Sequence, residues 1–61
     1  MNTDLTSQTA IIDPAPQTRV RPDIIGERVT VVDNGQSYFP TIRHRDGTTG
    51  RIHRGNLRIV P

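Results

Sequence analysis

Apolar and polar residues alternate along the middle of the chain. In the segment 26–33, Val29 and Val31 fall on one side, whereas Arg28 and Thr30 fall on the other. A period of two is typical of a β-strand that buries one of its faces. The segment is therefore predicted to be a half-buried strand.

Two dipeptides predict tight turns on either side of the next strand. Asn34-Gly35 and Asp46-Gly47 suit the positive φ angles that short β-hairpin loops require. A strand is therefore predicted between them, over residues 37–45. Its single proline cannot donate a backbone hydrogen bond, so this strand is expected to lie at an edge or to contain a bulge.

The last third of the chain continues the same pattern. A short strand is predicted over residues 48–54, with Ile52 facing inward between polar neighbours. Residues 54–56 are expected to form a single helical turn. Leu57 and Ile59 then return to the core on a closing strand.

The first third of the chain has no such period. Residues 1–9 are polar and predict a disordered tail. Pro14, Pro16 and Pro22 exclude a regular helix from the stretch that follows, because proline lacks a backbone N–H group and disfavours helical geometry in the residue before it. Short strands with frequent turns thus predict an all-β domain, a small barrel, over residues 10–61.

Length and composition limit the size of this domain. The chain has 61 residues, of which 31% are hydrophobic, so it has room for one small core. We expect the monomer to be marginally stable. Formation of a homo-oligomer or binding of a partner would stabilise the fold. The absence of cysteine excludes disulfides and thiolate metal ligands, and no apolar run approaches the length of a membrane span. A cytoplasmic location without membrane association is expected.

The order of these elements resembles the Src homology 3 (SH3) domain over residues 10–60. Residues 10–14 (AIIDP) stand where that family commonly has Ala-Leu-Tyr-Asp-Tyr. Residues 26–32 (GERVTVV) match the Gly-Asp/Glu pair that starts an apolar strand in the family, and residues 50–57 (GRIHRGNL) match its closing Gly-x-Ile-Pro-x-Asn-Tyr-Val segment. The resemblance implies an SH3-like five-stranded barrel that follows a flexible tail.

The positions that carry function in the SH3 family differ in this chain. Members of the family bind proline-rich peptides in a groove of aromatic side chains. The two tyrosines of the opening motif are Ile12 and Pro14 here, and the closing proline and tyrosine are His53 and Asn56. Only Tyr38 could stand for the groove tryptophan. Binding of proline-rich peptides is therefore not expected, and the resemblance concerns the fold alone.

Charge divides the chain into two parts. All eight basic residues are arginine; residues 1–40 carry three of them with five acids, whereas residues 41–61 carry five of them with one acid and both histidines. Strand alternation directs Arg43, Arg45, Arg51 and His53 outward from one hairpin, and Arg54 and Arg58 are expected near its rim. The exposed ring of Tyr38 nearby could stack a base. An anionic partner would relieve the repulsion within such a cluster. The candidate site consists of Arg43, Arg45, Arg51, His53, Arg54, Arg58 and Tyr38.

The candidate partners of this basic face are nucleic acid first and an acidic protein surface second. We therefore predict a small non-enzymatic binding module that holds nucleic acid in a regulatory role. A protein-interaction module encoded by a phage or plasmid is the first alternative, and a basic surface that is only solvated is another. An oligomeric reductase, similar to trimethoprim-resistant dihydrofolate reductase, is a remote alternative, because residues 50–53 keep only Ile52 of that enzyme's Val-Gln-Ile-Tyr motif.

Residues suited to catalysis or metal binding are few. His44 and His53 lack the additional ligands that a metal site requires at suitable spacing. Ser7 falls in the predicted tail and Ser37 in a predicted turn, so a hydrolytic triad is not expected. The sequence predicts neither an enzyme nor a cofactor.

Overall fold

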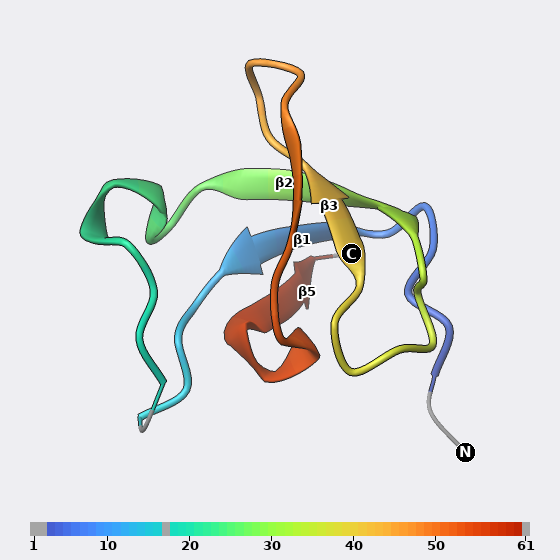
Figure 1. Cartoon of the computed structure of the whole chain (residues 1–61), viewed down its shortest axis with the longest axis horizontal. Helices are drawn as coiled ribbons and strands as arrows, with labels where there is room; N and C mark the ends of the chain where they lie inside the picture. The colour runs from blue at the N-terminus through green and yellow to red at the C-terminus, as the bar shows by residue number, and fades with distance from the viewer. Residues whose placement is uncertain (1–2, 17, 61) are drawn as a thin grey trace.

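Five short strands form one antiparallel β-sheet in the computed structural model, which describes residues 3–16 and 18–60. No α-helix occurs in this part of the chain, but two short 3-10 helices interrupt the loops. The elements in chain order are β1 (Thr9–Ile12), η1 (Pro22–Ile24), β2 (Arg28–Asp33), β3 (Thr41–Arg43), β4 (Thr49–Arg51), η2 (Arg54–Asn56) and β5 (Leu57–Val60) (Figure 1).

The strands follow one another as a meander, and the last strand returns to the first. The order across the sheet is β4-β3-β2-β1-β5, with every pair of neighbours antiparallel. In the register, Ala10 lies opposite both Val29 and Ile59. β4 and β5 are free edges, because no ladder joins them within residues 3–16 and 18–60. The prediction of an all-β domain is confirmed. The sheet is open at both edges, so the strands of the described part do not close into a barrel.

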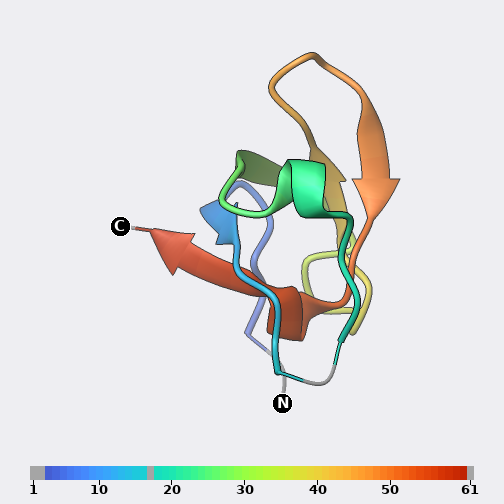
Figure 2. The same ribbon diagram turned by 90° about the vertical axis from the view of Figure 1, so that its left-hand side faces the viewer.

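One side of the sheet buries a small aliphatic core. Val29 and Val31 are buried on β2, whereas Arg28 and Thr30 are exposed, so the predicted alternation is confirmed. The loop 13–27, which contains η1, lies beside the sheet (Figure 2). Its side chains Val20 and Ile24 pack against this core. The buried residues are Leu5, Ala10, Ile12, Val29, Val31 and Ile42, and the half-buried residues packed against them are Val20, Ile24, Ile52 and Leu57.

The segment 3–8 packs against the sheet before β1 begins. Leu5 is buried in the core, and its backbone N–H donates to the carbonyl of Gly35 at 3.0 Å. The N–H of Ser7 donates to the carbonyl of Val31 at 2.7 Å. These hydrogen bonds join the segment to distant parts of the chain.

The predicted division was a tail over residues 1–9 and a domain over residues 10–61. Residues 1, 2, 17 and 61 of these two ranges lie outside the described residues. β1 begins at Thr9, so the sheet includes the last residue that was assigned to the tail.

The connection between β2 and β3 is longer than the tight hairpin that the sequence predicted. It spans residues 34–40, and β3 occupies only the central part of the strand predicted over 37–45. Asn34 has the expected left-handed backbone, with φ 54°, but the N–H of Ser37 donates to the Asn34 carbonyl and extends the turn. Pro40 has no N–H for a ladder, so regular pairing begins after it.

The end of the chain follows most of the predicted pattern. The helical turn expected over residues 54–56 is η2, and Ile52 and Leu57 are half-buried against the core. Phe39 and Ile59 are exposed, although the sequence placed Ile59 in the core. Phe39 is 51% exposed because it lies in the long β2–β3 connection, and Ile59 is 37% exposed because it lies on the free-edge strand β5.

Candidate functional site

The face of the sheet opposite the core carries arginines from several strands. Thr30 of β2 lies opposite Arg43 of β3. Ile11 of β1 lies opposite Arg28 of β2 on one side and Arg58 of β5 on the other. Because directly opposed residues point to the same side of a sheet, the three arginines share one face, here named the outer face.

A shallow hollow of about 480 Å³ lies on this outer face. Arg28, Arg43 and Arg45 surround it, together with the threonines Thr9 and Thr30. None of the three guanidinium groups has a hydrogen-bond or ion-pair partner among the described residues. Val29 and His44 complete the lining, and we name this cavity the arginine hollow.

The carboxylate of Glu27, beside the arginine hollow, is bonded to other groups. Oε1 of Glu27 accepts from the backbone N–H of Arg45 at 3.3 Å and lies 3.2 Å from Nδ1 of His44. The Glu27 and His44 side chains are both mostly buried. Glu27 therefore holds the end of β3 and the turn after it, and it forms no direct pair with a guanidinium group of the arginine hollow.

Asp46 is the second carboxylate near Arg45, in the turn between β3 and β4. Its Oδ1 accepts from the hydroxyl of Thr48 at 2.7 Å and from the backbone N–H of Thr48 at 3.0 Å. These hydrogen bonds, that of the hydroxyl first, hold the pKa of Asp46 below its ordinary value. Gly47 has a φ of 91°, which confirms the predicted Asp46-Gly47 turn. Asp46 is thus used to build the turn.

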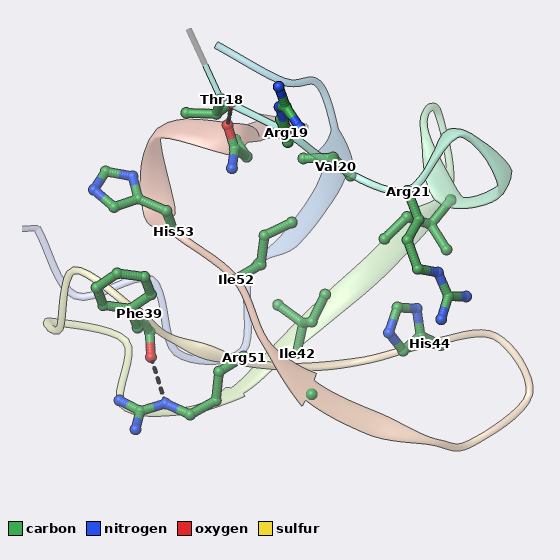
Figure 3. Close-up of a pocket in the computed structure, with 13 residues that line it drawn as sticks. Thr18, Arg19, Val20, Arg21, Phe39, Ile42, His44, Arg51, Ile52 and His53 are labelled. Atoms are coloured by element: carbon green, nitrogen blue, oxygen red, sulfur yellow. Dashed lines mark hydrogen bonds between the residues drawn. The ribbon is translucent and has the colours of Figure 1, made fainter.

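Arg51 departs from the predicted row of outward side chains. Its backbone lies opposite Thr41 in the β3–β4 ladder, but its Nε donates to the carbonyl of Phe39 at 2.9 Å (Figure 3). Arg51 does not line the arginine hollow. It is therefore grouped with the β2–β3 connection rather than with Arg43 and Arg45.

His53 and Tyr38 belong to a separate group of rings. The His53 and Tyr38 ring centroids are 6.3 Å apart at an interplanar angle of 15°, and the Phe39 ring meets His53 edge-on at 5.3 Å. Nδ1 of His53 accepts from the backbone N–H of Gly55 at 3.0 Å, so neutral His53 carries its proton on Nε2. Tyr38 is 63% exposed, as predicted, but its ring lies against His53.

The remaining two predicted site residues bind other parts of the chain. Arg54 is half-buried, with Nη2 donating to the Thr3 carbonyl at 2.8 Å and Nη1 donating to the Gln36 carbonyl at 3.4 Å. Arg58 shares the outer face, but its Nε lies 3.4 Å from Oδ2 of Asp13. Arg54 therefore has a structural role, and the charge of Arg58 is partly neutralised by its partner.

The structure thus brings together only Arg43 and Arg45 of the predicted site residues in the arginine hollow. It adds Arg28 and two threonines, which the sequence analysis did not include. The alternation of residues 26–33 already placed Arg28 on the outward side of its strand. The predicted Asn34-Gly35 hairpin already paired these two strands, but the sequence could not show their register, which places Thr30 opposite Arg43 and Arg28 near it.

Two other kinds of function were tested against the described geometry. Over residues 3–16 and 18–60, no group of three His, Cys, Asp or Glu side chains is placed to hold a metal ion. In the same part of the chain, no helix has the length and apolar character needed to cross a membrane.

Comparisons with known proteins identify no relative of this chain. No protein-family model, no curated protein and no solved structure matches the chain. The functional interpretation therefore depends on the chemistry of the surface.

Proposed function

We propose that this chain is a small cytoplasmic, non-enzymatic module that binds nucleic acid in a regulatory role, with phosphates seated in the arginine hollow. The observation that carries the proposal is the group of three guanidinium ions, from Arg28, Arg43 and Arg45, with no carboxylate bound to any of them in the described part. Like charges held together repel one another, and an anion relieves that repulsion. Guanidinium groups suit phosphate because their N–H donors match pairs of phosphate oxygens.

The residues that line the hollow suit contacts to the sugar-phosphate backbone of a nucleic acid better than contacts to its bases. Thr9 and Thr30 supply hydroxyl groups among the arginines, and hydroxyls commonly donate to phosphate oxygens. Neither Tyr38 nor Phe39 lines the hollow, so it offers no stacking platform for bases beyond the imidazole of His44. Binding is therefore expected to depend on salt and to depend little on sequence.

We also infer an SH3-like barrel as the kind of fold that carries this site. Three features support the inference: β5 pairs with β1, the long loop 13–27 joins β1 to β2, and η2 directly precedes β5. η2 and the start of β5 lie within residues 50–57, one of the segments on which the resemblance to the family rests. An experimental structure in which the last strand pairs elsewhere in the sheet would contradict the inference.

Salt-dependent binding to short duplexes tests the proposed function. Fluorescence anisotropy with labelled DNA and RNA duplexes, recorded between about 50 and 200 mM salt, gives the slope of log K against log salt. The slope is expected to be about −0.9 for each phosphate contact to B-DNA. Replacing any one of Arg28, Arg43 and Arg45 by glutamine should make the slope less negative by about 1. The same replacement should weaken binding to all sequences alike.

Arg19→Gln is the matched control for this experiment. Arg19 is exposed and also lacks a side-chain partner among the described residues, but it lies outside the arginine hollow. Its replacement removes the same charge and should leave the salt slope unchanged. The proposal is wrong if duplexes are not retained at low salt. It is also wrong if Arg19→Gln and Arg43→Gln make the slope less negative by the same amount. Recovery of one stoichiometric protein partner that resists nuclease treatment would favour an acidic protein surface as the ligand of this face.

A further inference from the structure

The strand β5 forms one free edge of the sheet, and the core is open to solvent beside it. Ile59 of β5 lies opposite Ala10 of β1, so the two side chains point to the same face. Ala10 is fully buried, whereas Ile59 is 37% exposed. In Figure 2 the end of β5 projects beyond the other elements. The core face of the sheet is therefore uncovered at its last strand.

A hollow of about 490 Å³ lies beside this edge. Leu57 and Ile59 line it from β5, and the buried Leu5 lines it from the N-terminal segment. Leu57 is half-buried against the core. The other residues that line the hollow are Thr3, Asp4, Gln8 and Arg54. The hollow thus continues the apolar core outward to the free edge.

The backbone of β5 also has polar groups that its neighbour β1 does not bind. The N–H of Asp13 donates to the carbonyl of Asn56 at 2.7 Å, just before the β1–β5 ladder. Hydrogen-bonded and non-hydrogen-bonded pairs alternate along antiparallel strands. In this register the backbone of Arg58 therefore faces β1, whereas the N–H and C=O groups of Ile59 point to the free side of the sheet.

The charges at this edge are balanced, in contrast to those of the arginine hollow. Nε of Arg58 lies 3.4 Å from Oδ2 of Asp13. Among the described residues, the hollow beside β5 is lined by one acid, Asp4, and one base, Arg54. The chain has a formal net charge of +2, so two copies repel one another, least where the surface is neutral. The β5 edge therefore suits a second copy of the chain better than it suits a polyanion.

We propose that β5 pairs with β5 of a second copy of this chain, in antiparallel orientation about a two-fold axis at Ile59. The same surface then serves both copies, as in other two-fold interfaces. The N–H and C=O groups of the two Ile59 residues exchange hydrogen bonds, and their side chains meet on the core face. Pairing covers apolar surface that a chain of 61 residues leaves open at this edge.

Arg58 selects this register over the neighbouring one. A two-fold axis at Arg58 would place the two arginines directly opposite each other, and like charges in that position destabilise a sheet. An axis at Ile59 places Arg58 opposite the partner's Val60 instead. The arginine can then keep its contact with Asp13 on the outer face.

The other free edge, β4, is less suited to pairing with a second copy. Its sequence is Thr-Gly-Arg, and Thr49 and Arg51 are exposed. The loop 13–27 also lies close to this edge, because Arg21 and Asp23 line a hollow together with Thr49. A second strand at β4 would therefore bury little apolar surface.

The association state of the whole chain tests the proposal. Samples are treated with nuclease and kept at high salt, which excludes bridging by nucleic acid. Light scattering after size-exclusion chromatography, from about 1 µM to about 1 mM, should show a mass that rises toward that of two chains. Ile59→Lys places a charge at the centre of the paired edge and should keep the mass of one chain throughout.

Two outcomes would overturn the proposal. One is a wild-type chain that stays monomeric at every concentration, which would leave the edge to a strand of another protein. The other is a dimer that Ile59→Lys does not weaken. The arginine hollow includes no residue of β5, so a failure of nucleic-acid binding would leave the proposed dimer standing.

Ile25→Lys is the matched control. Ile25 is an isoleucine of the loop 13–27 that is 52% exposed and lies outside the strands. Its replacement adds the same charge and should leave the dimer intact. If both lysine variants dissociate the dimer equally, added charge alone separates the copies and the proposal is wrong.

Ile59→Cys tests the register directly. The chain has no cysteine, so this variant carries a single thiol. Opposed residues of a hydrogen-bonded pair have Cα atoms about 5.5 Å apart, which is within the range that a disulfide spans. Mild oxidation should therefore join two Ile59→Cys chains and leave Ile25→Cys chains single on a non-reducing gel. Equal cross-linking of the two variants would contradict the proposed pairing.

Discussion

Arg43 and Arg45 of the β3–β4 hairpin are used in the opposite way to His53 and Arg54 of the segment that follows it, whereas Arg51 of the hairpin is bonded to the Phe39 carbonyl. In the hairpin, Arg43 and Arg45 extend from the sheet, and their guanidinium groups have no partner among the described residues. In the closing segment 52–60, His53 accepts a hydrogen bond from the backbone of η2, and Arg54 donates to two backbone carbonyls. The hairpin is open to a ligand, whereas the closing segment joins distant parts of the chain.

The difference shows that the contacts of a basic side chain, rather than its charge, determine its role. Arg54 reaches the carbonyl of Thr3 near the other end of the chain. In the same turn, Oδ1 of the buried Asn56 accepts from the N–H of Ala15 at 3.0 Å and from the hydroxyl of Thr18 at 2.6 Å. Substitutions in the closing segment and its contacts should therefore reduce stability, and substitutions in the hairpin should reduce binding.

The largest expected effect is at Gly35, which lies beside the N-terminal segment and next to Gln36, whose carbonyl accepts from Arg54. Gly35 lies where the N-terminal segment crosses the β2–β3 connection, and a Cβ at this position would meet Oδ1 of Asp4 and the backbone nitrogen of Thr6. Gly35→Ala must therefore displace that segment, which carries the buried Leu5. We expect the free energy of unfolding to fall by about 1–3 kcal/mol, as for other overpacked sites, measured by urea denaturation followed by circular dichroism.

Gly50→Ala is the control from the hairpin. A Cβ at Gly50, in β4, would approach Nε2 of His44 at 3.9 Å, an ordinary contact, and Gly50 has no positive φ that alanine would resist. The free energy of unfolding should change by less than about 0.5 kcal/mol. Equal destabilisation by the two substitutions would show that the region around Gly35 is no more tightly packed than the hairpin.

The next effect separates stability from binding with two arginines. Arg54→Ala removes hydrogen bonds to two backbone carbonyls and should lower the free energy of unfolding by about 1 kcal/mol, with duplex affinity nearly unchanged. Arg43→Ala should lower duplex affinity and change stability by less than about 0.5 kcal/mol. Thermal unfolding and anisotropy on the same samples measure both quantities. If Arg54→Ala weakens binding as much as Arg43→Ala does, the closing segment belongs to the binding surface.

Local features of the fold could be predicted from the sequence, and long-range ones could not. The alternation of Val29 and Val31 and the helical turn over 54–56 depend on neighbouring residues, and both are present in the structure. Leu5 is a single apolar residue in a polar stretch, so nothing nearby indicates its burial. Its position depends on packing against residues about thirty positions away, including the hydrogen bond to the Gly35 carbonyl.

The same limit applies to the candidate site. Arg43 and Arg45 follow from the alternation of a single strand, and the arginine hollow includes both. Arg28 joins them through the register of β2 with β3, which the predicted hairpin turn alone does not determine. The contacts of Arg54 were equally unpredictable, because its acceptor at Thr3 is 51 positions away in the sequence.

Two Asp-x-Thr turns give the smallest and most local test of the comparison. In each turn the threonine hydroxyl and N–H donate to the aspartate: Thr6 to Asp4 in the N-terminal segment, and Thr48 to Asp46 at the hairpin tip. These bonds lower the pKa of both carboxyl groups below the ordinary value of 3.8. The stability that each contributes is therefore complete above pH 3.8 and is lost as the pH falls through the lowered pKa.

Thr6→Val and Thr48→Val remove the hydroxyl and keep the N–H, so each should raise the pKa of its aspartate part of the way toward 3.8 in an NMR titration. The two variants should differ in what they loosen. Thr6 is next to the buried Leu5, so its substitution should speed hydrogen exchange of the Leu5 amide, whereas substitution of Thr48 at the hairpin tip should not. Equal acceleration by both variants would mean that the hairpin tip and the N-terminal segment loosen together as one unit.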